Sequence, residues 1–231
     1  MLSKTRFSVA GKRILLYGAG HTAPLVLLHT VQGEGEEVYH ALQHLTQEEY
    51  SLALIDGLDW EGEMSPWPIT PLFKKDKNCT GGADGYLSVL TGEILTAILA
   101  VLPQPPVYMA LAGYSLAGLF ALYAAYRTKL FSRLACVSGS FWYPDFLAYA
   151  EHHDLLKKPE KIYFSLGDRE AKTRHRILST VEENTRRLAA FYHQQGIRTI
   201  FELNEGNHFQ QSEMRTAKGI AWMLTDKAIG K

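Results

Sequence analysis

A serine, an aspartate and a histidine stand in an order and setting that suit serine-dependent acyl transfer. Ser115 lies in Gly113-Tyr-Ser-Leu-Ala-Gly118, between an apolar β-prone run and a helix of small residues. Such a sharp strand-to-helix turn exposes the serine hydroxyl and is called a nucleophile elbow. An ordinary strand–helix turn with a capping serine would carry the same short motif. The choice between the two readings therefore depends on other residues.

A serine nucleophile needs a base, and the base needs a carboxylate to orient it. After Ser115, Asp168 is the first carboxylate that directly ends a β-prone run, and His208 follows the last such run. Serine, then acid, then histidine is a known chain order for such a triad. Glu170 competes with Asp168, because the same loop could swing it into place. The sequence predicts Ser115 as nucleophile, His208 as base and Asp168 as acid.

Other titratable residues fit simpler roles. Asp145 comes one strand too early and is typical of a helix N-cap. His40 and His44 are one helical turn apart but have no obvious third ligand, so no metal site is predicted. The other histidines after Ser115 lie in helical or charged stretches typical of solvated surfaces: His152, His153, His175 and His193.

Acyl transfer forms an oxyanion, which preorganised N–H groups must stabilise. The N–H of Leu116 is one candidate donor, because it begins the helix after the serine. The second donor is expected in the loop after the early strand 25–29, where two glycines let the backbone bend. Val31 and Gln32 are both candidates, and the sequence does not choose between them.

Aromatic residues near these groups could wall an apolar substrate pocket. Trp142 and Tyr143 follow the strand after the elbow, while Trp60 and Trp67 lie in the long segment 58–84. Ordinary core packing of the same rings is the alternative. Because long irregular loops inside compact domains tend to be functional, segment 58–84 is expected near the active site.

Strand and helix patterns alternate along the chain. Besides the strand before Ser115 and the helix after it, strands are expected at 12–17, 24–29, 52–55, 134–138, 161–166 and 198–203, and helices at 35–45, 86–102, 173–195 and 212–227. Repeated βα units favour a mostly parallel sheet with helices on both faces. Functional residues collect at the C-terminal strand ends of such sheets. The prediction is one α/β domain over residues 1–231.

Composition is typical of a globular protein, and the partner expected from the serine chemistry is a small-molecule ester. The chain has 231 residues, with 24 Lys plus Arg and 24 Asp plus Glu. This balance favours neither nucleic acid nor a membrane as partner. The N-terminus lacks the apolar run and cleavage site of a secretory signal, and two cysteines make no disulfide framework. A cytoplasmic location is therefore expected, and the oligomeric state stays unknown.

The chain resembles the putative-esterase branch of the α/β hydrolases, which holds esterase D, feruloyl esterase and enterochelin esterase relatives. The resemblance rests on five segments of the sequence: Trp60 to Pro68 leading into Gly81-Gly-Ala-Asp-Gly-Tyr86, the elbow, Val137-Ser-Gly-Ser-Phe-Trp142, Gly167-Asp-Arg-Glu170 and Gly206-Asn-His-Phe209. It implies the α/β-hydrolase fold and carboxylic-ester hydrolysis through an acyl-enzyme, without a cofactor, by Ser115, His208 and Asp168.

Two positions depart from the pattern of those relatives. Ala117 replaces a glycine often found in the elbow, and the early loop reads His29-Thr-Val-Gln where relatives often have His-Gly. Other functions use the same residues or scaffold. A thioesterase or acyltransferase would use the same triad, and a non-catalytic binding protein can use the same fold.

Overall fold

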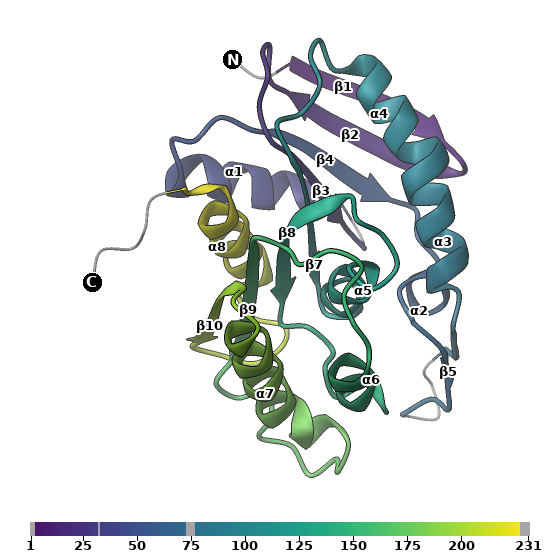
Figure 1. The fold of residues 1–231 in the computed structure, drawn as a ribbon, viewed down its shortest axis with the longest axis vertical. Helices are drawn as coiled ribbons and strands as arrows, with labels where there is room; N and C mark the ends of the chain where they lie inside the picture. The colour runs from purple at the N-terminus through teal and green to yellow at the C-terminus, as the bar shows by residue number, and fades with distance from the viewer. Residues whose placement is uncertain (1–2, 32, 73–76, 227–231) are drawn as a thin grey trace.

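An eight-stranded sheet forms the centre of the computed structural model, which describes residues 3–31, 33–72 and 77–226 (Figure 1). In spatial order the strands are β1 (Ser3–Val9), β2 (Lys12–Gly18), β4 (Ser51–Asp56), β3 (Leu25–His29), β7 (Met109–Tyr114), β8 (Phe131–Val137), β9 (Lys161–Gly167) and β10 (Arg198–Asn204). The pairs β1–β2 and β2–β4 are antiparallel, and every pair from β4 to β10 is parallel. The predicted mostly parallel α/β sheet is confirmed.

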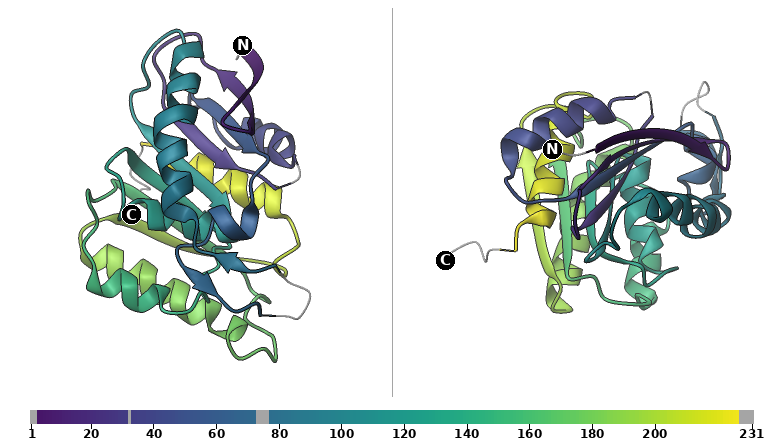
Figure 2. Two further views of the ribbon diagram at one scale, coloured as in Figure 1. Left: turned by 90° about the vertical axis from the view of Figure 1, so that its right-hand side faces the viewer. Right: turned by 90° about the horizontal axis from the view of Figure 1, so that it is seen from above.

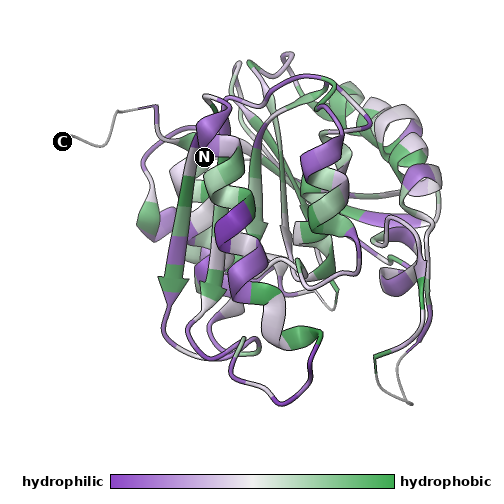
Figure 3. Cartoon of the chain, turned by 60° about the horizontal axis from the view of Figure 1, so that its bottom comes forward, coloured by the Kyte–Doolittle hydropathy of each residue, from purple (hydrophilic) through white to green (hydrophobic). Residues whose placement is uncertain are grey.

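Helices cover both faces of this sheet, as Figure 2 shows from two further sides. On one face, α1 (Gly35–Leu45) packs beside α8 (Ser212–Leu224). The other face carries α3 (Ala83–Val89), α4 (Leu95–Val101), α5 (Leu116–Ala124), α6 (Phe146–His152) and α7 (Val181–Gln194). All residues of α5 are buried. Hydrophobic residues gather where the helices meet the sheet, and hydrophilic residues lie on the outward faces (Figure 3). The sheet is thus covered by packed helices on both faces.

Segment 58–84 contains more regular structure than the sequence suggests. It includes the short helix α2 (Trp60–Glu63) and two paired two-residue strands, β5 (Pro68–Ile69) and β6 (Cys79–Thr80). The hydroxyl of Ser65 accepts a hydrogen bond from the Gly81 N–H at 2.9 Å, which ties the two sides of the segment together. The prediction of a wholly irregular loop is therefore wrong for these short elements.

The helical stretch Ala83–Val101, which includes the π-helical turn η1 (Leu90–Ile94), is long and apolar enough to cross a membrane by length and composition alone. One apolar face of this helix packs in the hydrophobic core. Leu90, Ile94 and Ile98 are fully buried against the core. Packing in the core accounts for the apolar character of the buried third of this helix.

The structure differs from the expected elements in two places. It contains strand β1, which the sequence does not predict. The helix expected from residue 173 begins only at Val181, after a 3₁₀ turn at Leu178–Thr180. Residues 168–177 form an extended loop instead. This loop follows β9 and therefore lies at the sheet edge where a site is expected.

Candidate active site

Ser115 is held in a strained conformation between β7 and α5. Its φ of 58° and ψ of −122° lie where side-chain-bearing residues rarely occur. The Ser115 N–H donates to the Val137 carbonyl at 3.0 Å, and the Ser140 N–H donates to the Ser115 carbonyl at 3.1 Å. These bonds hold the turn against the end of β8. The turn has the geometry expected of a nucleophile elbow.

Gly113 permits the close approach of β7 and α5. A Cβ atom at Gly113 would lie 2.3 Å from the backbone carbon and oxygen of Ala117. We expect Gly113→Ala to lower the free energy of unfolding by about 3 kcal/mol, because an overfilled contact forces the backbone to move. Urea unfolding measures this loss. Gly92→Ala is the control, since a Cβ there meets no atom within 4 Å; equal midpoints for the two variants would contradict the packing argument.

Three side chains form a continuous hydrogen-bonded chain at the sheet edge. Ser115 Oγ lies 3.0 Å from Nε2 of His208, and Nδ1 of His208 lies 2.7 Å from Oε2 of Glu170. The three residues follow the ends of β7, β10 and β9, which meet at one edge of the sheet. The Tyr114 hydroxyl donates to the His208 carbonyl at 2.7 Å and fixes the histidine loop to β7. The distances suit a nucleophile, a base and an orienting acid.

Glu170, and not Asp168, is the carboxylate in contact with His208. Oδ1 of Asp168 accepts the Gly206 N–H at 2.8 Å and so braces the loop that leads to His208. The chain reverses after β9, with the Glu170 N–H donating to the Gly167 carbonyl at 3.1 Å. This reversal returns the longer Glu170 side chain toward His208. The structure does not bring the predicted Asp168 to His208, and Glu170, the competing residue in the same loop, makes that contact instead.

The Glu170 carboxylate is ionised and acts only as an acceptor. Burial raises its pKa, but hydrogen bonds from His208, from the Gly167 N–H and from the Ser138 hydroxyl bring the pKa below its usual value. Since a carboxylate cannot donate, the proton of the shared contact belongs to Nδ1 of His208. In the neutral imidazole, Nε2 then accepts from the Ser115 hydroxyl. A general base needs this tautomer.

Arg215 of α8 forms a buried ion pair with Glu170, and no sequence pattern predicts this contact. Its Nη1 lies 3.0 Å from Oε1 of Glu170, and 1% of the arginine side chain and 4% of the glutamate side chain are exposed. Its Nη2 donates to the Glu205 carbonyl at 2.9 Å, in the loop before His208. Arg215 therefore positions the acid and the loop of the base together.

We expect Arg215→Met to lower the free energy of unfolding by about 3 to 5 kcal/mol at neutral pH, because it leaves a buried carboxylate without its cation. Glu170 has a lowered pKa, so in the parent protein its contribution to stability is lost as the pH falls through that value. The cost of the substitution should therefore shrink at about pH 4, where Glu170 of the variant is protonated. Urea unfolding at both pH values, with Arg215→Lys as the charge-retaining control, measures the effect. A pH-independent cost would rule out its electrostatic origin.

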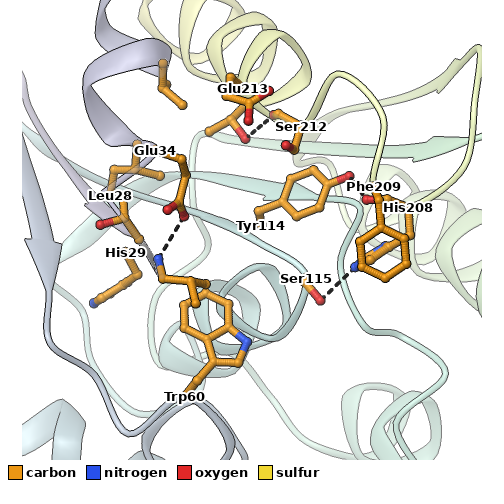
Figure 4. A pocket seen from close by; sticks show the side chains of 14 residues that line it. Leu28, His29, Glu34, Trp60, Tyr114, Ser115, His208, Phe209, Ser212 and Glu213 are labelled. Carbon is orange, nitrogen blue, oxygen red and sulfur yellow. Dashed lines mark hydrogen bonds between the residues drawn. The ribbon is translucent and has the colours of Figure 1, made fainter.

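The predicted oxyanion donors are only partly available. Leu116 is the first residue of α5, so its N–H has no acceptor within the helix. The Val31 N–H donates to Oε1 of Glu34 at 2.8 Å and already has a carboxylate acceptor (Figure 4). Gln32 lies outside the described residues. Leu116 is therefore the better-placed predicted donor, and Val31 can serve only where Glu34 releases its N–H.

Two cavities meet at Ser115. The smaller, of 420 Å³, lies between the loop after β3 and the start of α8 (Figure 4), and the larger, of 740 Å³, lies between segment 58–84 and the loop after β9. Trp60, Phe209 and His208 line both cavities together with Ser115. Phe209 is 89% exposed, so this aromatic ring stands open at the mouth of the site.

Two of the four aromatic residues that the sequence suggests for the pocket line these cavities. Trp60 lines both, and Trp142 lines the larger one. Tyr143 is buried and donates its hydroxyl to the Trp67 carbonyl at 2.5 Å, while Nε1 of Trp67 donates to the Pro144 carbonyl at 3.1 Å. The Trp67 ring also stacks against Phe146. The pocket role predicted for Trp67 and Tyr143 is wrong, because both rings anchor segment 58–84 to the core.

The sequence model of the Putative esterase family matches residues 29–211, a range that contains Ser115, Glu170 and His208. The chain belongs to the Putative esterase family. The predicted resemblance is confirmed, and membership supports hydrolysis of carboxylic esters. This esterase-family chain is also 23% identical over 160 residues to the uncharacterized protein YbbA of Bacillus subtilis (strain 168). That match covers 68% of the chain and 64% of YbbA, less than two thirds of the relative.

Solved structures show the same fold for this esterase-family chain. The siderophore hydrolase EstA from Aspergillus nidulans matches with a TM-score of 0.77 and 19% identity, over 96% of the chain and 94% of EstA. The enterobactin esterase FES from Shigella flexneri matches with a TM-score of 0.68 and 19% identity, over 96% of the chain and 58% of FES. At these identities the likeness establishes the α/β-hydrolase fold, and the substrate has to be argued from the site itself.

Proposed function

We propose that this protein hydrolyses carboxylic esters of small molecules through Ser115, His208 and Glu170, by way of an acyl-enzyme. The observation that carries the proposal is the unbroken hydrogen-bonded chain from Ser115 Oγ through both ring nitrogens of His208 to Glu170. This chain lies where two cavities meet, so an ester can place one half on each side of the serine. Family membership supports the same reaction class.

In the proposed mechanism, Nε2 of His208 takes the proton of Ser115 while Oγ attacks the ester carbonyl carbon. The Leu116 N–H, at the positive end of α5, stabilises the resulting oxyanion. His208 then protonates the departing alcohol, which leaves an acyl group on Ser115. Water, activated by the same Nε2, releases the acid and restores the serine. Glu170 stabilises the imidazolium in both steps. The proposed reaction needs no cofactor.

A fluorophosphonate probe tests the nucleophile. Attack by Ser115 on phosphorus expels fluoride and forms a stable adduct, which peptide mass spectrometry locates. We expect one adduct per chain at Ser115 and matching loss of p-nitrophenyl acetate hydrolysis, whereas heat-unfolded protein should stay unlabelled. A folded protein that neither reacts nor hydrolyses the ester would overturn the proposal and favour a non-catalytic binding protein.

The pH profile tests the base. Protonated His208 cannot accept the serine proton, so kcat/KM should fall as the pH is lowered. Glu170 has a pKa below its usual value and stays ionised at mildly acidic pH. The acid limb of log kcat/KM should therefore have a slope of about one, for a single proton. A slope near two in p-nitrophenyl acetate assays would show that a second group titrates with the base.

A further inference from the structure

The two cavities that meet at Ser115 differ in charge. Among the described residues, three cationic side chains line the larger one, Lys77, Arg169 and Lys172. Two carboxylates also line it, Glu61 and Glu170, but the oxygens of Glu170 are taken by His208 and Arg215. The larger cavity therefore keeps an excess of positive charge.

The smaller cavity has the opposite sign. Glu34 and Glu213 line it, and its lining among the described residues includes no lysine or arginine. His29 lines it too, but burial, and to a smaller extent the charge of Lys12, lower the pKa of His29 to about 3, so this ring is neutral. Figure 4 shows both carboxylate side chains on the wall away from the Ser115 hydroxyl. A negatively charged group is repelled from this side.

The loop after β9 supplies much of the positive charge. Residues 168–177 carry four Lys or Arg side chains and two carboxylates. Of these carboxylates, Asp168 lies 3.8 Å from Nε of Arg169, and Glu170 is buried beside Arg215. Arg169 and Lys172 are both exposed at the cavity, and Lys172 has no carboxylate partner among the ion pairs of the described residues. Clustered like charges at the mouth of a cleft raise the local concentration of ions of opposite sign.

The larger cavity also has an apolar wall. Its apolar lining includes Ile69, Leu72, Trp142, Leu178 and Val181. A group that fills it therefore needs an apolar body as well as a charge. Such mixed pockets use apolar contact for affinity and a few polar groups for orientation.

We propose that the preferred substrate is an ester whose half in the larger cavity carries a negative charge on an apolar body. The inference rests on the proposed hydrolysis at Ser115 and adds the charge and orientation of the substrate. Attraction in the larger cavity and repulsion from Glu34 and Glu213 in the smaller one act in the same direction. The charge thus determines which half of the ester lies on which side of the serine.

Matched esters test the charge preference. With the charge on the acyl half, monophenyl glutarate is compared with phenyl pentanoate. With the charge on the alcohol half, 4-acetoxybenzoate is compared with its methyl ester and with a 4-acetoxyphenyl trimethylammonium salt. In one of the two sets we expect the anion to have the higher kcat/KM, through a lower KM. Raising the ionic strength should shrink this preference, because salt screens exposed charges.

The Lys77→Glu, Lys172→Glu double variant tests the location. It should lower the ratio of anionic to neutral kcat/KM about tenfold, since two exposed charges are reversed. Differences in intrinsic ester reactivity cancel when each ratio is compared with that of the parent. Lys129→Glu is the control, because Lys129 is exposed and precedes β8, at the opposite edge of the sheet.

The outcomes separate the two proposals. Ser115-dependent hydrolysis without any preference for an anion overturns the substrate inference and leaves ester hydrolysis intact. A preference that survives the double variant, or that falls equally in Lys129→Glu, also overturns the assignment to the larger cavity. Failure of every ester, together with no fluorophosphonate adduct, overturns the proposed function itself.

Discussion

Ser115→Ala is expected to lower kcat for p-nitrophenyl acetate by about 10⁴- to 10⁶-fold, the largest effect of any single substitution in this chain. The variant keeps the cavities, the Leu116 N–H and His208, so whatever hydrolysis remains comes from binding and oxyanion stabilisation alone. Alanine has the same Cβ as serine and demands no new space at φ 58°. Steady-state kinetics together with thermal unfolding measure the effect on a folded protein.

Ser140→Ala is the matched control for this substitution. Ser140 Oγ lies 3.3 Å from Ser115 Oγ, so it is the nearest competing hydroxyl, but it has no contact with His208 among the hydrogen bonds of the described residues. A loss of only a few fold is expected, on the scale of one neutral hydrogen bond. If Ser115→Ala keeps a tenth of the parent activity, or if Ser140→Ala is the more damaging change, Ser115 is not the nucleophile.

Glu170→Gln is expected to lower kcat by about 10³- to 10⁴-fold. The amide removes the negative charge that stabilises the imidazolium. Its NH₂ group can also donate to Nδ1 of His208, which favours the tautomer with a proton on Nε2. That proton blocks acceptance from Ser115. The loss should therefore appear in kcat, with KM little changed.

Asp168→Asn is the paired control, because the two carboxylates lie in one loop and only one contacts His208. An amide oxygen at position 168 can still accept the Gly206 N–H, so the histidine loop keeps its brace. We expect activity within a few fold of the parent. A larger loss in Asp168→Asn than in Glu170→Gln would restore Asp168 as the acid.

The sequence predicts the parallel part of the sheet well, because its strands are apolar runs buried on both faces. Strand β1 is missed for the opposite reason. It is an edge strand whose residues are exposed or half-buried, so Ser3 to Val9 reads as a polar N-terminal arm. The helix expected from residue 173 starts late because apolar spacing does not mark where the chain leaves the preceding loop.

The site residues that directly follow a strand could be predicted from the sequence, because the ends of parallel strands meet at one edge of the sheet. Ser115 and His208 are found that way, and the structure places them 3.0 Å apart. The acid depends on a chain reversal after β9, which moves the contact from Asp168 to Glu170 and leaves no signal in residue order. The buried contact of Arg215 with Glu170 could not be predicted from the sequence, because a charged residue on an amphipathic helix normally faces water.

The hydrogen bond from Tyr114 to the His208 carbonyl has a consequence for how this protein can diversify. The hydroxyl of Tyr114, the residue next to Ser115, is bonded to the backbone of His208 and so ties the loop of the base to the strand that carries the nucleophile. The described residues of segment 58–84 supply none of the Ser115–His208–Glu170 contacts. Sequence drift there, and at Arg169 or Lys172 beside Glu170, can reshape what is bound while the distance between nucleophile and base stays fixed.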